Sequence, residues 1–525
     1  MTEGASGLQS DPGRDASDLA EFGYRQRLDR TLGGFSSFAA GFSYLSILTG
    51  LPQLFYLGYG AGGPAFFWTW PAVFAGQFLV ALCFAELAAE YPLSGGVYQW
   101  AKRVGPGAVG WMAGWVYLAC AVISLASVAL ALQGTLPQVS PWFQRIGDAG
   151  DPADAARNAV LLGCVLIGLS TLVNVAGVRL LARINNVGVF AEMAGAAILI
   201  VMLAVHARRG PGVILEAQGR GLGLPMGYLG PFLAAALTPS FVMYGFDTAG
   251  ALAEETDDPR RRAPRAILGA LAAVGAAGML LILGALMAAP DLADPALGRM
   301  GGGMPAIIKG ALGSGWGRLL LVDVAVAIGV CTLTVHAAAV RLVFAMARDN
   351  GLPGSGALAA MPGSSRTPRL PAILLGACAA AILVANANFP RIVELMASVA
   401  IVWANLGYLL VTVPLLARRL RPGGARRRDG LFHLGRWGLP VNVLAVAWGV
   451  AIVANVGWPR PGVYGEPWHR RFVAPMATAA MLGAGGLYYA LARRRGRNGV
   501  LEEHRAPEFA GASGRETGSI EERFG

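Results

Sequence analysis

Residues 228–267 read YLGPFLAAALTPSFVMYGFDTAGALAEETDDPRRRAPRAI, and this stretch decides the fold. It begins as an apolar run long enough to span a membrane, but Thr238-Pro239-Ser240 and then Tyr244-Gly245-Phe246-Asp247 interrupt it midway. Proline removes a backbone donor and clashes with the preceding turn, and glycine loosens a helix further. A bilayer tolerates such a break only where the freed backbone faces protein or a water-filled cavity. The pattern predicts an interrupted membrane span that lines a transport site; the alternative is a proline-kinked helix with ordinary packing.

The composition indicates a membrane protein. Of 525 residues, 55% are hydrophobic and only 14% are charged, and the mean hydropathy is +0.53. Soluble proteins carry about 25% charged residues. The net charge of +11 is concentrated between apolar runs, as at Lys102-Arg103, 260–262 and 418–428. Because basic residues gather in the cytoplasmic loops of membrane proteins, this distribution places both ends of the chain inside the cell and predicts no nucleic-acid partner.

Apolar runs of roughly 20 residues, the length that a bilayer requires, recur about twelve times along the chain. We expect a transmembrane domain over residues 31–494, with a first repeat at 33–208, a second repeat at 228–420 and two additional helices at 437–492. Residues 1–30 and 495–525 are polar and charged, which predicts a disordered cytoplasmic arm and a disordered cytoplasmic tail. The expected location is the plasma or inner membrane.

A second interruption lies in the first span, at about residues 33–60. Its middle contains Ser46, Thr49, Gly50 and Pro52, the same kinds of residue that break the span after Tyr228. The two broken spans each open a block of five spans and are an odd number of spans apart, so the two blocks enter the membrane in opposite directions. This arrangement is typical of an inverted repeat with its substrate site between the broken helices.

Several kinds of chemistry have no support in the sequence. The five cysteines are scattered one to an apolar segment, which predicts buried thiols without disulfides or a metal site. Neither Lys102 nor Lys309 stands in a GK[ST] context, and no HExxH or GxSxG motif is present. We therefore expect no enzyme activity and no cofactor, and transport driven by a gradient or by exchange.

Three motifs in order carry a family resemblance: residues 85–96 (AELAAEYPLSGG), 245–256 (GFDTAGALAEET) and 347–353 (ARDNGLP). Together they resemble the amino acid–polyamine–organocation transporters, over about residues 35–494. The break at residues 46–50 and the Gly62-Gly63-Pro64 sequence are most like the amino acid/choline transporter branch, which includes GABA permeases.

The resemblance implies a LeuT-like fold, an all-α membrane protein with ten core spans in a 5+5 inverted repeat, broken spans 1 and 6, and two further spans. It implies secondary transport by alternating access. The backbone at the first break, with Ser46, Thr49 and Gly50, is then expected to meet the substrate, and Phe241 matches the aromatic gate of span six. Relatives elsewhere in the superfamily have a more glycine-rich first break than this chain, where Gly50 stands alone with Pro52 nearby.

The same residues support a zwitterionic substrate on physical grounds. Exposed N–H groups at the positive end of a half-helix attract a carboxylate, and carbonyl groups at the other end suit an ammonium. The hydroxyls of Ser46 and Thr49 can add hydrogen bonds, or can instead bond back to the preceding turn. Phe241 and Tyr244 are three residues apart and share a face if the helix continues. The candidate substrate-binding residues are Ser46, Thr49, Gly50, Phe241, Tyr244 and Gly245.

The carboxylates near these breaks allow different roles. Asp247 either binds a substrate amine or caps the resumed half-helix, and we favour the cap. Glu254 and Glu255 are predicted to form ion pairs near the inner surface beside residues 260–262, and Glu86 has a similar inner-end position and role.

Glu192 is the candidate for proton coupling. We place it about five residues into a span over roughly residues 187–205, and carboxylates inside a membrane are functional candidates by default. The alternative is a neutral or paired structural glutamate near the inner interface. The roles of Asp323 and His336 stay open, although His336, four residues after Thr332, is able to line the pathway.

These observations predict a secondary amino acid permease for GABA or another small zwitterion, coupled to protons. Hydroxyl residues in spans one and eight leave sodium coupling open. The nearest alternative is a carrier of choline, ethanolamine or polyamines, which an aromatic cage would favour through cation–π contacts. A nutrient sensor that does not transport is a third possibility.

Overall fold

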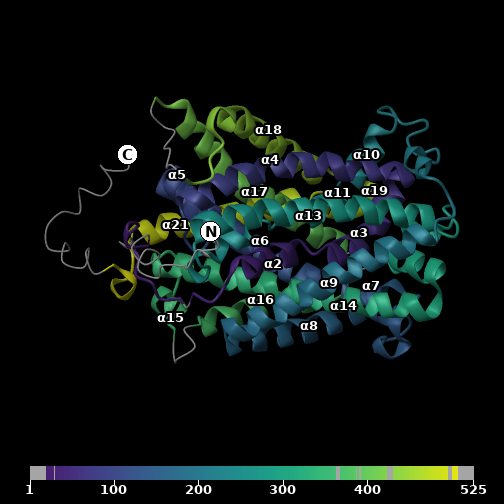
Figure 1. Cartoon of the computed structure of the whole chain (residues 1–525), viewed down its shortest axis with the longest axis horizontal. Coiled ribbons are helices and arrows are strands. Elements are labelled where there is room, and N and C mark those ends of the chain that lie inside the picture. Colours follow the sequence, from purple (N-terminus) through teal and green to yellow (C-terminus); the bar gives the residue numbers. More distant parts are fainter. Residues whose placement is uncertain are drawn as a thin grey trace, which may run out of the picture.

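The computed structural model describes residues 19–28, 30–361, 367–385, 387–388, 392–422, 430–494 and 499–506. In these residues the secondary structure is helical, apart from two single-residue bridges. Nine helical segments of the described chain are long and apolar enough to cross a membrane, and they lie alongside one another (Figure 1). The protein is therefore an all-helical, multi-pass membrane protein.

The helices that build the bundle are α2 (Gly34–Leu45), α3 (Ile47–Gly62), α4 (Thr69–Glu90), α6 (Gly107–Ala129), α8 (Pro152–Ala176), α9 (Val178–Val205), α13 (Pro259–Ala288), α14 (Gly303–Arg348), α17 (Ile392–Leu420) and α18 (Gly438–Gly457). The helices α10 (Leu229–Ala235), α11 (Leu237–Val242), α16 (Arg369–Ala385) and α21 (Val473–Arg494) complete it. Short helices are α5 (Val97–Val104), α7 (Leu132–Val139), α12 (Thr248–Ala251), α15 (Ser355–Ala359), α19 (Pro461–Tyr464) and α20 (Trp468–Arg471), together with the 3₁₀ turns η1 (Pro64–Trp68), η2 (Pro141–Phe143), η3 (Pro211–Leu215), η4 (Ala253–Glu255), η5 (Pro295–Gly298), η6 (Gly435–Trp437) and η7 (Glu502–His504).

The bundle has two ends that differ in their connections. Helices α5 and α15 lie at one end, and α10, α7 and α19 lie at the other (Figure 1). We refer to these as the α5 end and the α10 end. The first described residues and the segment 499–506 both lie at the α5 end, because the backbone N–H of Arg25 donates to the carbonyl of His504 and that of Leu501 donates to the carbonyl of Arg348.

The predicted break in the first span is confirmed. Helix α2 ends at Leu45 and α3 begins at Ile47, and Ser46 between them has φ 28° and ψ 95°. A positive φ is uncommon for a residue with a Cβ and is found where the surrounding structure enforces it. Pro52 lies inside α3, six residues after Ser46.

The predicted break in the second stretch is also confirmed. Helix α11 ends at Val242, and a turn of five residues separates it from α12, which begins at Thr248. Gly245 within this turn has φ +93°, and a Cβ there would lie 2.0 Å from ring atoms of Tyr44. Glycine is therefore required both by the backbone conformation and by the close approach of α2.

The two broken helices run antiparallel. The N–H groups of Thr31 and Leu32, just before α2, donate to the carbonyl of Glu255 after α12. At the opposite end, the Tyr228 hydroxyl before α10 donates to the carbonyl of Gly62 at 2.8 Å. The middles also pack tightly, since a Cβ on Gly50 would lie 2.8 Å from a methyl of Val242. The two breaks consequently face each other inside the bundle.

The span that carries Glu192 begins earlier than the sequence predicted. Helix α9 starts at Val178, nine residues before the expected start, so Glu192 lies in the middle of the helix and not near its end. The apolar pattern begins only after Arg179, Arg183 and the Asn185-Asn186 pair, and a helix is free to continue past the apolar zone because its backbone bonds are internal.

Part of the predicted arm and part of the predicted tail are packed. Leu19 and Tyr24 are buried against Leu93, and Tyr24 pairs with Arg505 in an antiparallel bridge. Apolar side chains in otherwise polar segments account for this packing. The remainder of the two predicted disordered segments, at 1–18, 29, 495–498 and 507–525, lies outside the described residues.

The predicted partners of the paired carboxylates need correction. Glu254 pairs with Arg348 at 2.7 Å and Glu255 with Arg341 at 3.0 Å, both on α14, and not with the arginines at 260–262. The prediction considered only neighbours in sequence, whereas α14 ends beside η4. Glu86 does form an ion pair near a helix end, with Arg419 at 2.6 Å.

Candidate functional site

The first break holds the carboxylate of Glu192. Its Oε1 accepts hydrogen bonds from the Ser46 hydroxyl at 2.8 Å and from the Leu48 N–H at 3.2 Å, and the residue is 1% exposed. Leu48 is in the first turn of α3, where free N–H groups and the helix dipole favour a negative charge. The hydroxyls of Ser46 and Thr49 are 2.6 Å apart. The anion-binding position predicted at this break is thus filled by the protein's own carboxylate.

A second carboxylate approaches Glu192 from α14. A Cβ added to Gly195, one turn after Glu192, would lie 1.7 Å from Oδ2 of Asp323, so the absence of a side chain at 195 makes room for that carboxylate. The Oε2 atom of Glu192 and the Oδ2 atom of Asp323 are both buried and have no hydrogen-bond partner among the described residues. Both acidic side chains therefore retain acceptor capacity.

The second break holds Asp247, and its predicted role as a helix cap is wrong. Its side chain makes no capping bond to α12. Instead Oδ1 accepts from the hydroxyls of Tyr117 at 2.5 Å and Tyr408 at 2.8 Å, and the Tyr408 hydroxyl also accepts from the Gly245 N–H at 2.7 Å. Tertiary donors from α6 and α17 have replaced the local N–H groups that a cap would use.

Aromatic side chains form the wall between the two breaks. The Tyr44 and Tyr244 rings meet edge to face with centroids 6.2 Å apart, and the Phe241 and Tyr244 rings do so at 5.9 Å. The Tyr244 hydroxyl is 2.8 Å from the Ser124 hydroxyl of α6. Tyr244 lies beyond the end of α11, so the tertiary packing, and not a continuous helix face, brings it against Phe241.

Two small cavities lie beside these aromatic rings. One is lined by Thr49, Gly50 and Phe241 among others, the other by Asp247 among others, and Tyr44 contributes to both. Each leaves about 10 Å³ for the centre of a water molecule, which is about the room one water requires. A substrate consequently fits only after the surrounding side chains move.

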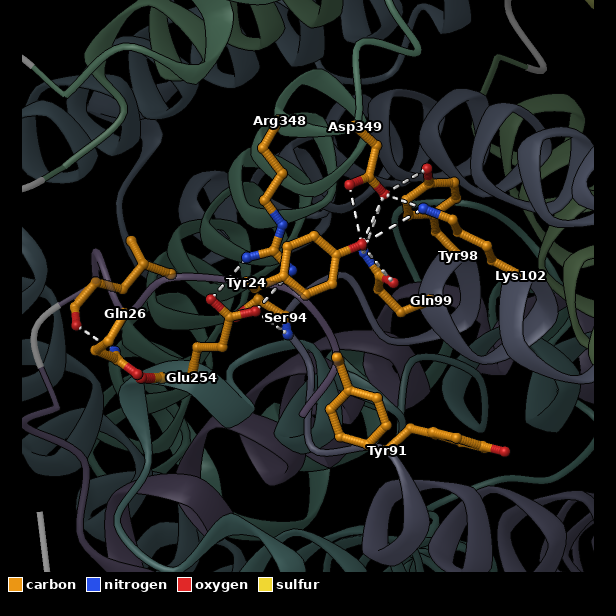
Figure 2. A network of polar contacts seen from close by, with 12 residues as sticks. Tyr24, Gln26, Tyr91, Ser94, Tyr98, Gln99, Lys102, Glu254, Arg348 and Asp349 are labelled. Atoms are coloured by element: carbon orange, nitrogen blue, oxygen red, sulfur yellow. Dashed lines mark hydrogen bonds and ion pairs between the residues drawn. The ribbon is translucent and has the colours of Figure 1, made fainter. Parts of the chain in front are cut away.

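The α5 end is closed by a polar network centred on Asp349 (Figure 2). Its carboxylate accepts from the hydroxyls of Tyr24 at 2.9 Å and Tyr98 at 2.8 Å and from Lys102 Nζ at 2.9 Å. Burial opposes the charged form, but the positive charges of Lys102 and Arg348 outweigh it and lower the pKa of Asp349. Burial likewise opposes the charge of Lys102, and Asp349 outweighs it, which raises the pKa of Lys102.

A second part of the network joins the same end (Figure 2). Glu254 binds Arg348 and accepts from the backbone N–H of Ser94 at 2.9 Å. The Arg348 guanidinium lies over the Tyr24 ring, 4.0 Å from its centroid. The network therefore ties the N-terminal arm to the loop after α4, to η4 and to the end of α14.

The α10 end is open by comparison. A cavity of about 1350 Å³ is lined there by α3, α10, η5 and the α18–α19 segment, with Tyr56 and Glu394 on its wall. The Tyr56 hydroxyl donates to Glu394 at 2.7 Å. Tyr56 is ten residues after Ser46, so the cavity wall at Tyr56 lies about 15 Å along α3 from the first break.

The structure gathers most of the predicted site residues around the two breaks and leaves others elsewhere. Those that converge are Ser46, Thr49, Gly50, Glu192, Phe241, Tyr244 and Gly245. His336 lies apart, hydrogen-bonded to Ser170 of α8 and to the carbonyl of Ala372 of α16, which is a packing role. Thr332 bonds back to the carbonyl of Ile328.

Sequence reasoning missed the residues that hold Asp247 and Asp349. Tyr117 and Tyr408 are 130 and 161 positions from Asp247 in the chain. No local pattern marks either tyrosine, and only the broken helix next to them indicated that polar partners were needed.

Comparison with known proteins gives a consistent result. Residues 32–491 match the model of a family described as amino acid permease. Amino-acid permease BAT1 of Arabidopsis thaliana is 29% identical over 456 residues, which cover 83% of this chain and 86% of the relative. A BAT1 homolog of Oryza sativa subsp. japonica is 28% identical over 469 residues, covering 84% and 87%. The GABA-specific permease of Saccharomyces cerevisiae is 24% identical over 494 residues, covering 91% and 84%.

The family match spans both broken helices, the carboxylates beside them and the network at the α5 end apart from the N-terminal arm with Tyr24. It confirms the resemblance derived from the three sequence motifs, and it identifies a family of transporters and not of enzymes. This chain belongs to the amino acid permease family of the amino acid–polyamine–organocation superfamily.

Proposed function

We propose that the protein is a secondary active transporter that carries an amino acid across the cell membrane by alternating access. In this proposal the antiparallel broken helices are the first elements of two inverted five-helix repeats, the α5 end faces the cytoplasm, and the substrate binds between the breaks. Lys102 and Arg103 lie at the α5 end, and basic residues gather on the cytoplasmic side of membrane proteins, which supports this orientation. The polar network closes the α5 end, whereas the α10 end has the large cavity. They correspond to a transporter whose cytoplasmic side is shut.

One observation supports the coupling mechanism: the carboxylate of Glu192 occupies the start of α3. A substrate carboxylate that binds the same N–H groups must displace it. Two ionised carboxylates cannot share so small a site, because like charges at close range strongly favour protonation of one of them. We propose that Glu192 takes up a proton as the substrate carboxylate arrives, so that proton and amino acid enter together.

The role of the remaining residues follows from this arrangement. The hydroxyls of Ser46 and Thr49 bond to each other and, through Ser46, to Glu192, so they are available to a substrate once Glu192 has moved. Phe241 and Tyr244 form the lid of the site, and Gly50 and Gly245 allow the two backbones to approach. The Oε2 atom of Glu192, which has no hydrogen-bond partner among the described residues, is available to take up the proton.

Uptake into proteoliposomes tests the proposal. The probes are radiolabelled alanine, lysine, 4-aminobutyrate and choline, each with and without an inward proton gradient. We expect the gradient to stimulate uptake of at least one amino acid. In Glu192→Gln we expect stimulation to be lost while exchange of the same amino acid across the membrane remains, because the neutral amide no longer needs a proton to leave the site.

A carboxylate far from the breaks provides the control. Glu216 is an exposed carboxylate at the α10 end, and Glu216→Gln should keep the full response to the gradient. Uptake of choline but of no amino acid would mean that the substrates are amines and not amino acids. Gradient-stimulated uptake that is unchanged in Glu192→Gln would refute the coupling role, and a folded protein that binds amino acids without transporting them would refute the permease function.

A further inference from the structure

Asp247 is a buried carboxylate that no cation neutralises within the described chain. It is 1% exposed, and none of the ion pairs among the described residues includes it. The next carboxylates in sequence, Glu254 and Glu255, are by contrast paired with Arg348 and Arg341. A buried charge is costly unless it is paired, so an unpaired acidic group inside a membrane bundle calls for a partner that the protein itself does not supply.

The geometry of the carboxylate leaves room for such a partner. Both tyrosine hydroxyls, from Tyr117 and Tyr408, donate to Oδ1. An ionised carboxylate has about four acceptor positions on two oxygens, so Oδ2 keeps its capacity. Asp247 also lines the lower of the two small cavities, the one nearer the α5 end. An ammonium group in that cavity would find an anchored acceptor and the rings of Tyr44 and Tyr117 on the cavity wall, and aromatic rings favour cations through their π faces.

The two cavities are stacked along the bundle axis. On α6 the upper cavity is lined by Ser124 and the lower by Tyr117, seven residues earlier. On α14 the corresponding residues are Cys331 and Ala338, again seven apart. Seven helical residues rise about 10 Å. The upper cavity is lined by Leu45, Thr49 and Gly50 on the two sides of the first break, where a carboxylate is expected, and the lower cavity is lined by Asp247.

This separation sets the length of the substrate. In an α-amino acid with an apolar side chain, the ammonium and carboxylate groups share one carbon, so they cannot reach both cavities. Each further carbon–carbon bond of an extended chain adds about 1.2 Å of reach. A chain with several methylenes between carboxylate and ammonium therefore spans from the start of α3 past Tyr44 to Asp247.

We propose that Asp247 binds a distal ammonium group of the substrate, so that the transported amino acids are ω-amino acids and basic amino acids. This assignment rests on the proposed function and narrows it. Tyr44 stands between the two cavities and contacts Tyr244 edge to face, so its ring must turn aside for the methylene chain. Asp247 is thus the residue that selects for charge at the far end of the substrate.

A matched pair of ligands tests the assignment without a mutation. Lysine and norleucine have the same backbone and chain length and differ by the terminal ammonium. In the purified full-length protein in lipid nanodiscs, we expect lysine to bind at least 10-fold more tightly than norleucine. The preference should disappear in Asp247→Asn, whose amide keeps the size of the side chain and an oxygen that accepts from the tyrosines. Norleucine binding should change less than 3-fold in that variant.

Three other results would count against the proposal. Equal binding of lysine and norleucine by the wild-type protein would overturn it and leave the permease function standing. Loss of lysine and norleucine binding to the same extent in Asp247→Asn, with the melting temperature retained, would show that Asp247 serves the fold or the transport cycle in general. Failure of the wild-type protein to bind or transport any amino acid would instead overturn the proposed function itself.

Discussion

Replacing Asp349 with asparagine should open the α5 end of the transporter. The carboxylate joins three separate parts of the chain, because it accepts from Tyr24 of the arm, from Tyr98 and Lys102 of α5, and lies at the end of α14. These parts must separate before a substrate leaves by this end. In the open state the polar groups of these parts bond to water. The network therefore stabilises the closed state by the difference in free energy between its internal hydrogen bonds and those to water.

The size of the effect follows from the bonds that the charge strengthens. A hydrogen bond to a charged group contributes about 1.5–3 kcal/mol net, against about 1 kcal/mol for a neutral one. Asparagine keeps an acceptor for a tyrosine but loses the charge that Lys102 faces. We therefore expect a shift of about 2 kcal/mol toward the open state, which is about 30-fold in population.

Cys331 provides a natural reporter for this shift. Its side chain is 2% exposed and lines the upper cavity. In nanodiscs, with Cys164 and Cys378 replaced by serine, the rate of reaction with a charged thiol reagent should rise about 30-fold in Asp349→Asn. A Cys331→Ser protein identifies the labelled site. Glu466→Gln, which removes an exposed ion pair with Arg471, should have no effect. A labelling rate that stays at the wild-type value in a folded Asp349→Asn protein would refute the closing role of the network.

Three further predictions concern single positions and pH. Gly245→Ala should reduce transport more than 10-fold, since its Cβ would lie 2.0 Å from the Tyr44 ring and φ is +93°; wild-type uptake kinetics would contradict the packing argument. Gly195→Ala should displace Asp323, because Oδ2 of Asp323 would lie 1.7 Å from the new Cβ, and the pH profile of uptake should change. Gly329→Ala is the control, since a Cβ there meets open space, and it should leave the pH profile unchanged. The stability that Asp349 contributes should persist at neutral pH and disappear as the pH falls through its lowered folded-state pKa, because protonation then costs the folded state its ion pair. Melting temperatures of wild type and Asp349→Asn, compared across acidic pH, should converge; a difference that stays constant would contradict this assignment.

The breaks in the two spans were predictable because their signals are local. Proline, glycine and hydroxyl residues within a few positions disrupt a helix wherever it is placed, and Ser46 and Gly245 have the unusual backbone angles that such stretches allow. The partners across the bundle were not predictable in the same way. Ser46 and Glu192 are 146 residues apart, and no rule based on neighbours connects them.

Local rules also failed where tertiary partners were stronger. An aspartate before a helix ordinarily caps it, but at Asp247 two buried tyrosine hydroxyls take that place. Likewise Glu254 and Glu255 were expected to pair with the nearby arginines of the same segment, whereas the end of α14 brings Arg341 and Arg348 closer. In both cases the sequence indicated that a charge needed a partner, and the packing of distant helices decided which.

In the proposed mechanism, the two carboxylates at the breaks have complementary tasks. Glu192 already fills the anion position at the start of α3, while Asp247 lacks a cation in the described chain. A substrate with a carboxylate at one end and an ammonium at the other replaces the first charge and neutralises the second. The Glu192 carboxylate is then expected to be protonated, because a buried charge that loses its hydrogen-bond donors favours the neutral form. The charge in the site is therefore balanced only when one proton enters with each zwitterion. In this scheme, Glu192→Gln uncouples the proton without changing the preference for lysine over norleucine, and Asp247→Asn changes the preference without uncoupling the proton.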